Sequence, residues 1–412
     1  MAPGSAAVAA PAVSLNAARH ALLFGNFAIG CGVMVVAGSL NDLTRALNIS
    51  VAMGGQLIAL AAVMMCLGAP LLATLLGSWD RRRLLSLALL WYALGHALSA
   101  FAPSYATLLP LRALSVLAAA VFTPQAAAAM SALAAPQERG RAITYIFLGW
   151  GVASVLGMPV HSFIGEAWGW RWAFGLVAVL ASIGALWVWR AVPAGIRPPV
   201  MRLSAWREAF SQPTLMAVVA VTACTSAGQF TLASYLAPYY RQVLGAHAAQ
   251  ISFLFLCFGA FGLTGNVLVS RHIDRLGAPR IVAVLLSLMA STLLLWPLAR
   301  TVPLTALVLL PWGLATFASN SAQQARLSHA APALAPALMA LNTSAIYLGQ
   351  AVGAGGGGAL VAARSALGDV GAALYAPLHW LGLGWVLTAL LLSRWAQRRM
   401  ALSARTLPHG AH

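Results

Sequence analysis

The sequence has no lysine and little charge of either sign. Its 24 basic residues are all arginine, its acidic residues number 7, and charged residues make up 8% of the 412, against roughly 25% in an ordinary soluble domain. So little charge excludes a soluble globular protein. An apolar share of 61% excludes a disordered chain, because a chain that stays unfolded is poor in hydrophobic residues and rich in charge.

Cysteine is also scarce. The four cysteines lie inside apolar runs and lack the Cys-x-x-Cys spacing of many metal sites; they are Cys31, Cys66, Cys224 and Cys257. Such cysteines usually act as small buried hydrophobic residues. We therefore expect neither a disulfide framework nor a metal site, and no motif in the chain indicates a cofactor.

Long hydrophobic runs dominate the remainder of the sequence. Twelve runs of about 20 residues can be placed along it, and each is long enough to cross a ~30 Å hydrocarbon layer as a helix. The short connections leave no room for a sizeable domain outside the membrane. We therefore predict an all-α membrane protein with helices over residues 18–40, 51–76, 84–102, 106–134, 141–165, 171–191, 213–237, 250–271, 280–299, 303–325, 336–362 and 372–394.

The longest polar connection, residues 192–212, separates the twelve runs into six and six. It predicts two six-helix bundles joined by a basic linker. The predicted segments are a lead (1–17), an N-terminal bundle (18–191), the linker (192–212), a C-terminal bundle (213–394) and a tail (395–412). The first run exceeds a signal-peptide core in length and lacks a clear cleavage site, so we expect it to be retained as the first helix.

The net charge of +17 would indicate nucleic-acid binding if it covered one face of a small soluble domain. Here the arginines lie between the apolar runs, and cytoplasmic loops of membrane proteins retain positive charge. With the N-terminus in the cytoplasm, 18 arginines fall on the cytoplasmic side and 5 on the other. We therefore expect both termini in the cytoplasm, a bacterial inner or plasma membrane location, lipid as the surroundings and no nucleic-acid partner.

Two similar charged groups follow the second and eighth runs. They are Asp80, Arg81, Arg82 and Arg83 in the first group, and Asp274, Arg275, Gly277 and Arg280 in the second. An acid followed by arginine in a short loop can hold two helix ends together by charge and hydrogen bonding. A solvated ion pair is the simpler interpretation of either loop alone. Their matching positions favour a duplicated chain.

These loops resemble the motif Gly-x-x-x-Asp-Arg-x-Gly-Arg-Arg/Lys of the major facilitator superfamily. The second loop has Ser270 in place of the leading Gly, and the first lacks the internal Gly. Arg112 also stands where that family has a membrane-embedded arginine. The resemblance covers the whole chain and implies two pseudo-symmetric six-helix bundles, alternating access to a site near the midplane and a monomer. It also implies that the two charged loops act in gating on the cytoplasmic side.

The fifth run resembles one branch of that family, the drug:proton antiporters. It carries Gly149, Gly157, Pro159 and Gly165, as in the branch's Gly-Pro motif, with His161 where the motif has Gly. The run Gly-Trp-Arg-Trp-x-Phe at the start of the sixth helix is also typical of the branch. This part of the resemblance implies proton-coupled efflux.

Small residues four apart in the fifth and eleventh runs predict close approach of another helix. They are Gly149, Ala153 and Gly157, and then Gly349, Gly353 and Gly357. Pro159 should bend the fifth helix, because its nitrogen cannot donate a hydrogen bond. Tight packing in any membrane helix would explain both patterns equally well.

Arg112 is a charge that we expect inside the membrane. A guanidinium stays ionised and costs about 3 kcal/mol or more near mid-membrane, so it should face water or a partner inside the bundle. It either braces backbone carbonyls or influences the protonation of a neighbour. Asp42 and His161 are the candidate proton carriers; a surface aspartate and a hydrogen-bonded structural histidine are the respective alternatives.

Polar side chains repeat on single helical faces, mostly in the second half of the chain. In lipid, such a face points to the bundle interior or to a water-filled cavity, although hydrogen bonds between helices would also explain it. The candidate cavity residues are Asn26, Gln56, Gln125, Thr222, Thr225, Ser226, Gln229, Thr316, Asn320, Gln323, Gln324, Thr343, Tyr347 and Gln350, with Tyr235 and Trp312 as flat apolar contacts for a ligand.

Together these features predict a transporter that exports a small neutral or weakly amphipathic molecule, such as a drug, a sugar or a metabolite, by proton coupling. No carboxylate lies deep in a predicted helix, which disfavours multiply charged cations as substrates. Proton-coupled uptake is the alternative. A membrane enzyme would need paired acids, a metal group or a nucleophile with its base, and none is apparent. A sensor or scaffold would leave the polar faces without a purpose.

Overall fold

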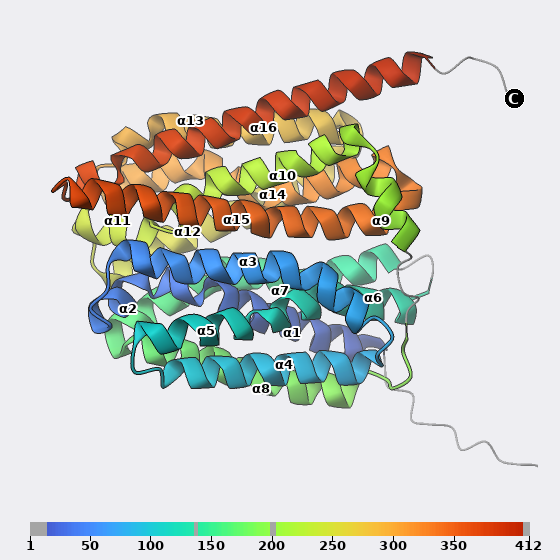
Figure 1. Cartoon of the computed structure of the whole chain (residues 1–412), viewed down its shortest axis with the longest axis horizontal. Coiled ribbons are helices and arrows are strands. Elements are labelled where there is room, and N and C mark those ends of the chain that lie inside the picture. Colours follow the sequence, from blue (N-terminus) through green and yellow to red (C-terminus); the bar gives the residue numbers. More distant parts are fainter. Residues whose placement is uncertain (1–14, 136–138, 198–202, 407–412) are drawn as a thin grey trace, which may run out of the picture.

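A computed structural model describes residues 15–135, 139–197 and 203–406, and Figure 1 shows that these ranges are α-helical with short connections. The N-terminal half contains α1 (Leu15–Gly38), α2 (Leu40–Ala46), α3 (Val51–Leu75), α4 (Arg81–Ala100), α5 (Tyr105–Ser115), α6 (Leu117–Leu133), α7 (Arg139–Trp168) and α8 (Trp170–Ala191). The helix α9 (Leu203–Phe210) lies in the linker. The C-terminal half contains α10 (Pro213–Ala233), α11 (Leu236–Gln242), α12 (Ala248–Leu276), α13 (Ala278–Leu295), α14 (Val302–Ala330), α15 (Ala335–Ala366) and α16 (Ala372–Thr406), with 3-10 turns at Trp296–Leu298 and Pro332–Leu334.

Twelve helical segments in the described ranges are long and apolar enough to cross a membrane, which confirms the predicted fold class. The fourth span consists of α5 and α6, and the seventh consists of α10 and α11. The break in the fourth span falls at Val116, just after the Ser115 hydroxyl has bonded back to the carbonyl of Arg112 at 3.0 Å.

Several boundaries differ from the sequence prediction. Residues 40–46 form the short helix α2 beyond the first span, and the linker contains α9. The last helix continues to Thr406 instead of ending at 394. Ala396 of this extension is fully buried in a cluster with Leu215 and Leu338, so packing continues past the expected end.

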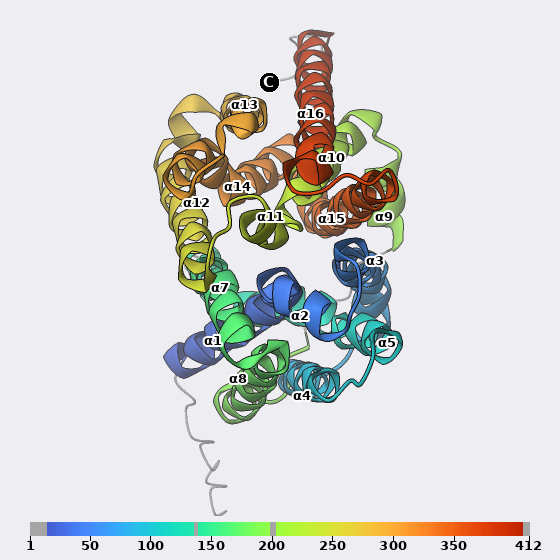
Figure 2. The ribbon, with the colours of Figure 1, turned by 90° about the vertical axis from the view of Figure 1, so that its left-hand side faces the viewer.

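The two halves lie side by side, each around its own hydrophobic core (Figures 1 and 2). α3 packs against α15 and α7 against α12, and these two pairs of helices join the halves. The helices α2 and α11 lie at one end of the molecule, which we name the α2 end, and α9 lies at the other, the α9 end.

Glycines bring α7 onto α1, and α15 onto α10, in the same way. A Cβ atom added to Gly149 would lie 2.1 Å from the carbonyl oxygen of Leu23, and one added to Gly349 would lie 2.1 Å from that of Ala223. A shift of 200 residues converts the first pair into the second. The close approach predicted for both runs is therefore present, and it is made by equivalent residues of the two halves.

The same shift relates the contacts between the halves. A Cβ atom on Gly259 of α12 would meet Val155 of α7 at 2.5 Å, and one on Gly355 of α15 would meet Ala59 of α3 at 3.7 Å. Adding 200 to the residues of one half and subtracting it from those of the other exchanges these two contacts. The halves are therefore related by a pseudo-twofold axis, as the sequence predicts.

We expect Gly353→Ala to lower the melting temperature of the purified protein in detergent. The new methyl group would lie 2.3 Å from the carbonyl oxygen of Ala227, which is backbone and cannot move away cheaply, and such overpacking costs about 1–3 kcal/mol. Gly384→Ala is the matched control, because no atom lies within 4 Å of its added Cβ. Equal melting temperatures for the two variants would contradict the close packing of α15 on α10.

Candidate functional site

Arg112 is buried inside the N-terminal half and is bound mainly by the backbone of α1. Its Nη1 donates to the carbonyl oxygen of Gly32 at 2.8 Å, and its Nη2 donates to that of Val33 at 3.1 Å. Only 2% of the residue is exposed. Helix carbonyls can accept a second hydrogen bond, so they satisfy part of a guanidinium that would otherwise be costly in lipid.

His96 of α4 is the third partner of Arg112, and the sequence analysis missed it. Its Nε2 lies 3.1 Å from Nη1 of Arg112, and its Nδ1 lies 2.9 Å from the carbonyl oxygen of Tyr92. The residue is fully buried. A histidine well inside a hydrophobic run was the signal in the sequence, but nothing there shows that it faces Arg112.

Asp42, one of the two candidate proton carriers, forms no hydrogen bond or ion pair with Arg112 in the described part of the chain. It lies on α2, ten residues beyond Gly32, which is about 15 Å along a helix axis. One carboxylate oxygen accepts from the backbone nitrogen of Trp170 at 2.7 Å, where α8 begins, and the other accepts from Arg45 at 3.1 Å. A carboxylate at a helix N-terminus is stabilised by the unpaired N–H groups there, so Asp42 stabilises the start of α8.

His161 is also buried in the N-terminal half. Its Nε2 bonds to the carbonyl oxygen of Cys31 at 2.9 Å, while its Nδ1 has no hydrogen-bond partner among the described residues. The other motif residues of α7 pack against neighbouring helices. Gly165 meets Ser39, and the carbonyl of Pro159 accepts a hydrogen bond from Ser252 of the C-terminal half at 3.2 Å.

Of the polar residues predicted in the N-terminal half, two are buried and one is exposed. Asn26 is fully buried; it donates to the carbonyl of Ile146 at 3.2 Å and accepts from Thr123 at 2.9 Å. Gln125 is buried as well. Gln56 is exposed and accepts a hydrogen bond from Tyr105 of α5 at 2.7 Å, within its own half.

In the C-terminal half, the structure joins three helices through a chain of amide and hydroxyl groups, the amide network. Thr222 of α10 donates to Asn342 of α15 at 2.6 Å, and Asn342 donates to Asn320 of α14 at 3.1 Å. Gln323 donates to Thr222 at 3.4 Å, and Gln324 donates to Asn320 at 3.4 Å. Asn342 is the centre of this network and was missed, although it precedes the predicted Thr343.

The remaining candidates lie around this network or are packed away from it. Thr316 donates to Gln229 of α10 at 2.5 Å. Thr225 and Thr343 bond to carbonyls of their own helices, and Ser226 and Gln350 are buried. Tyr347 packs against the core of the N-terminal half.

Tyr235 and Trp312 are fully buried and offer no exposed face to a ligand in this conformation. The Tyr235 hydroxyl donates to the carbonyl of Ala354 at 2.6 Å. The Trp312 ring packs edge-on against Phe258, with 5.2 Å between the ring centroids.

The first charged loop fixes the linker onto the start of α4. Asp80 accepts from the backbone nitrogens of Arg83 and Gly195, and the backbone nitrogen of Arg81 donates to the carbonyl of Ile196. The buried Arg81 side chain bonds to the carbonyls of Gly77 and Trp79 at 3.0 and 2.9 Å.

Arg82 lies over the ring of Trp189, 4.3 Å from its centroid. In the second loop, Gly277 has a φ of 81° between α12 and α13, a conformation that favours glycine. Arg275 and Arg280 are exposed, and the side chain of Asp274 lies outside the described part of the structure.

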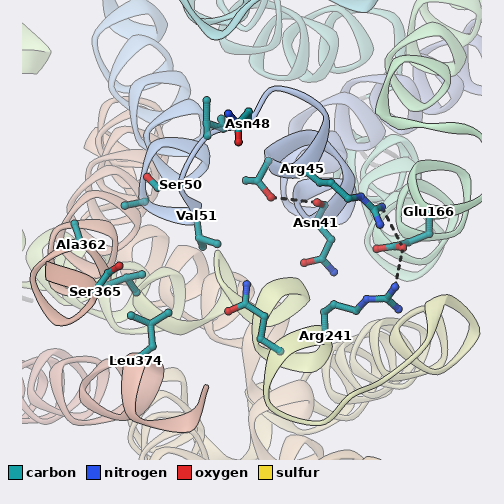
Figure 3. Close-up of a pocket in the computed structure, with 15 residues that line it drawn as sticks. Asn41, Arg45, Asn48, Ser50, Val51, Glu166, Arg241, Ala362, Ser365 and Leu374 are labelled. Carbon is teal, nitrogen blue, oxygen red and sulfur yellow. Dashed lines mark hydrogen bonds and ion pairs between the residues drawn. The ribbon is translucent and has the colours of Figure 1, made fainter. Parts of the chain in front are cut away.

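A cavity of about 580 Å³ lies between the halves at the α2 end (Figure 3). Its polar lining includes Asn41, Arg45, Glu166, Arg241 and Ser365, and none of the predicted cavity residues lines it. Glu166 lies 3.6 Å from Arg45 of its own half and 3.9 Å from Arg241 of the other half. Asn41 also donates across the boundary to the carbonyl of Ala237 at 3.0 Å.

We expect Asn342→Ala to destabilise the C-terminal half. The change removes one hydrogen bond each from the Thr222 hydroxyl and the Asn320 carbonyl oxygen, which keep only the longer 3.4 Å contacts from Gln323 and Gln324, at a cost of about 1–2 kcal/mol. Thr343→Ala is the matched control, since its hydroxyl bonds only to the carbonyl of Met339 in its own helix. Melting curves in detergent should show a lower midpoint for Asn342→Ala; a shift no larger than that of the control would contradict the network.

Comparison with known sequences agrees with this architecture. The Major Facilitator Superfamily model matches residues 22–354. The inner membrane transport protein YdhP of Escherichia coli K12 is 29% identical over 354 residues, which cover 85% of this chain and 90% of that protein. A chloramphenicol resistance protein of Streptomyces lividans is 32% identical over 339 residues, 79% of this chain and 84% of that protein.

Two solved structures share the fold. A bacterial homologue of the human lysosomal transporter Spinster, in an inward-facing and unoccupied conformation, aligns with a TM-score of 0.74 at 18% identity, covering 94% of this chain and 98% of that chain. A D-xylose-proton symporter aligns with a TM-score of 0.71 at 16% identity, covering 92% and 97%. By its twelve helices, its duplicated halves and these matches, the chain is a transporter that belongs to the Major Facilitator Superfamily.

Proposed function

We propose that this transporter exports a small neutral or weakly amphipathic molecule from a bacterial cell by proton-coupled alternating access. The observation that carries the proposal is the amide network. It provides hydrogen-bond donors and acceptors without charge, and among the described residues no carboxylate bonds to it. A neutral polar molecule can exchange hydrogen bonds with such groups, whereas a multiply charged cation would lack a counter-charge.

Partial exposure of the network supports access to it from the space between the halves. Asn320, Gln324 and Thr343 are half-buried, in contrast to the buried Asn342. Tyr347 on the same helix packs against the opposite half. We infer that a substrate binds between these residues of α14 and α15 and the N-terminal half.

The charge distribution supports an orientation with both termini in the cytoplasm. In that orientation the α2 end faces outward and the α9 end faces the cytoplasm. Three polar contacts between the halves, at Asn41, Glu166 and Ser252, lie toward the α2 end. They support an inward-facing state with its outer end closed. We further propose an inner-membrane location and a monomer.

The ion pair between Glu166 and Arg241 is the charged contact of this outer closure. Because Arg45 pairs with the same carboxylate from within the N-terminal half, it is a matched control for the pair that crosses between halves. Only Arg241 should separate from Glu166 when the outer end opens.

We expect Arg241→Gln to raise the population of the outward-open state and Arg45→Gln to leave it unchanged. Ala52→Cys, at a buried position that lines the outer cavity, can be labelled with a membrane-impermeant maleimide in cells, with the four native cysteines replaced by alanine. An exposed ion pair contributes about 0.2–1 kcal/mol, so labelling should rise by up to about fivefold. Equal labelling of the two variants would exclude a closing role for the pair that crosses.

We expect the protein to lower the cellular accumulation of an exported compound, and chloramphenicol is the first probe because of the relative from Streptomyces lividans. Everted membrane vesicles with an acidified interior should accumulate it, and a protonophore should abolish the accumulation. Asn320→Ala should weaken it, since Asn320 is a half-buried acceptor of the network. Accumulation in right-side-out vesicles instead would indicate uptake by symport.

A further inference from the structure

His96 and Arg112 form a hydrogen bond between two buried side chains in the N-terminal half. Nε2 of His96 lies 3.1 Å from Nη1 of Arg112, and the residues are 0% and 2% exposed. The rings of Tyr92 and Phe174 lie around the imidazole, with centroids 4.2 and 5.8 Å away. No acidic residue in the described part of the chain forms an ion pair with Arg112.

The partners of His96 determine where its proton lies. The carbonyl oxygen of Tyr92 only accepts hydrogen bonds, so Nδ1 of His96, 2.9 Å away, must carry a hydrogen. The Arg112 guanidinium only donates, so Nε2 must present its lone pair. Both contacts can exist together only when His96 is neutral and protonated on Nδ1.

A proton on Nε2 of His96 is therefore incompatible with the position of Arg112 seen here. It would replace an acceptor by a second donor and place two positive charges about 3 Å apart in a region of low dielectric constant. Arg112 would have to leave the carbonyls of Gly32 and Val33, or the proton would have to leave His96. The binding of Arg112 to α1 and the binding of a proton to His96 thus exclude each other.

The other groups around His96 do not change this relation. Among the described residues, the ionisable groups near it are Arg112 on α5, Tyr92 on its own helix, His161 on α7, the buried Cys31 on α1 and, from the C-terminal half, Tyr347 on α15 beside Tyr92. The hydroxyl of Tyr92 donates to α1, at the carbonyl of Ile29. The neighbouring helix α6 carries no ionisable residue, and α8 contributes only an aromatic ring at this point.

We infer that His96 is the residue that binds the transported proton, and that Arg112 displaces this proton when its guanidinium binds the carbonyls of α1. This inference rests on the proposed proton coupling and names its residue. In the outward-open state a proton from outside water binds Nε2; in the inward-facing state Arg112 returns to α1 and the proton leaves to inside water. One proton enters and one leaves, and no other group is changed.

His161 and the carboxylates fit this role less well. Nε2 of His161 donates to the carbonyl of Cys31, and the ring makes no hydrogen bond to Arg112, so the guanidinium acts on His161 only through its charge and does not compete for the same nitrogen. Asp42 and Glu166 pair with arginines at the α2 end. Of these groups, His96 alone bonds directly to the buried charge.

The link can reach the other half through α1. Both side chains bond to carbonyls of one turn of α1: Tyr92 bonds to that of Ile29, and Arg112 bonds to those of Gly32 and Val33. α1 packs closely on α7, which packs on α12 of the C-terminal half. If Arg112 leaves the carbonyls of α1, the packing of α1 on α7 can change, and α7 contacts the other half.

The first experiment separates coupling from transport in proteoliposomes that contain the full-length protein, with chloramphenicol as the probe. In His96→Gln the amide can still donate to the Tyr92 carbonyl and accept from Arg112, but it cannot bind a proton. We expect His96→Gln to exchange radiolabelled chloramphenicol across the membrane at the wild-type rate. It should lose the accumulation that a pH gradient drives in the wild type, which is about tenfold per pH unit when one proton is exchanged per molecule. Accumulation that survives in His96→Gln overturns the inference.

Two other histidines serve as controls in the same assay. His379→Gln changes another buried histidine, on α16 and far from Arg112 in sequence, and should leave both exchange and accumulation intact. His161→Gln should do the same. Loss of accumulation in His161→Gln alone would transfer the role to that residue and overturn the inference. A wild-type protein that exchanges the probe without responding to a pH gradient would remove the proposed coupling instead.

The second experiment needs no substrate. ¹⁵N spectra of histidine-labelled full-length protein, with His96 assigned by its absence in His96→Gln, should show the neutral form protonated on Nδ1 in neutral buffer. The Arg112→Gln variant should let His96 gain a proton when the buffer is acidified, under conditions where the wild type stays neutral. The Nε2-protonated form in the wild type, or identical spectra for both proteins across this range, would overturn the inference.

Discussion

A polar group inside a lipid layer has to find its hydrogen-bond partner within the protein, because no water is available there. This constraint explains both polar regions of the structure. Arg112 has no acidic partner among the described residues, and it obtains hydrogen bonds from carbonyls of α1 and from His96. The amides of the C-terminal half bond to each other across α10, α14 and α15. Neither arrangement contains a carboxylate, and Nε of Arg112 and Oε1 of Gln323 are buried without a partner, so each can respond when a new donor, proton or ligand arrives.

The glycine contacts hold the apolar parts of the helices together. Hydrophobic burial does not draw helices together within lipid, so close packing has to do so. Gly149 of α7 lies against the backbone of α1, and Gly349 of α15 lies against that of α10. Gly259 of α12 lies against the backbone of α7 at the boundary between the halves. Rigid units are thus joined at a boundary that contains few polar contacts, which suits two halves that move against each other.

The fold was largely predictable from the sequence, whereas the partners of the site residues were not. Apolar runs report helix length and number, so the twelve spans and the burial of Arg112 followed from local pattern. The bond of Asp42 to the start of α8 could not be predicted, because a sequence pattern does not tell which groups of neighbouring helices lie at the same depth. His96 and Asn342 were missed because each is a single polar residue whose importance comes from the helix opposite. The extension of α16 beyond 394 depends on packing against α10 and α15, which no local signal shows.

The 200-residue relation between the halves also shows where they have diverged. Applied to Arg112 it leads to Trp312, which is fully buried. The duplicated scaffold therefore carries a buried arginine with a histidine partner in one half and a buried aromatic ring at the position of that arginine in the other. This difference lets the N-terminal half specialise in binding charge, while the C-terminal half can change to suit a different substrate.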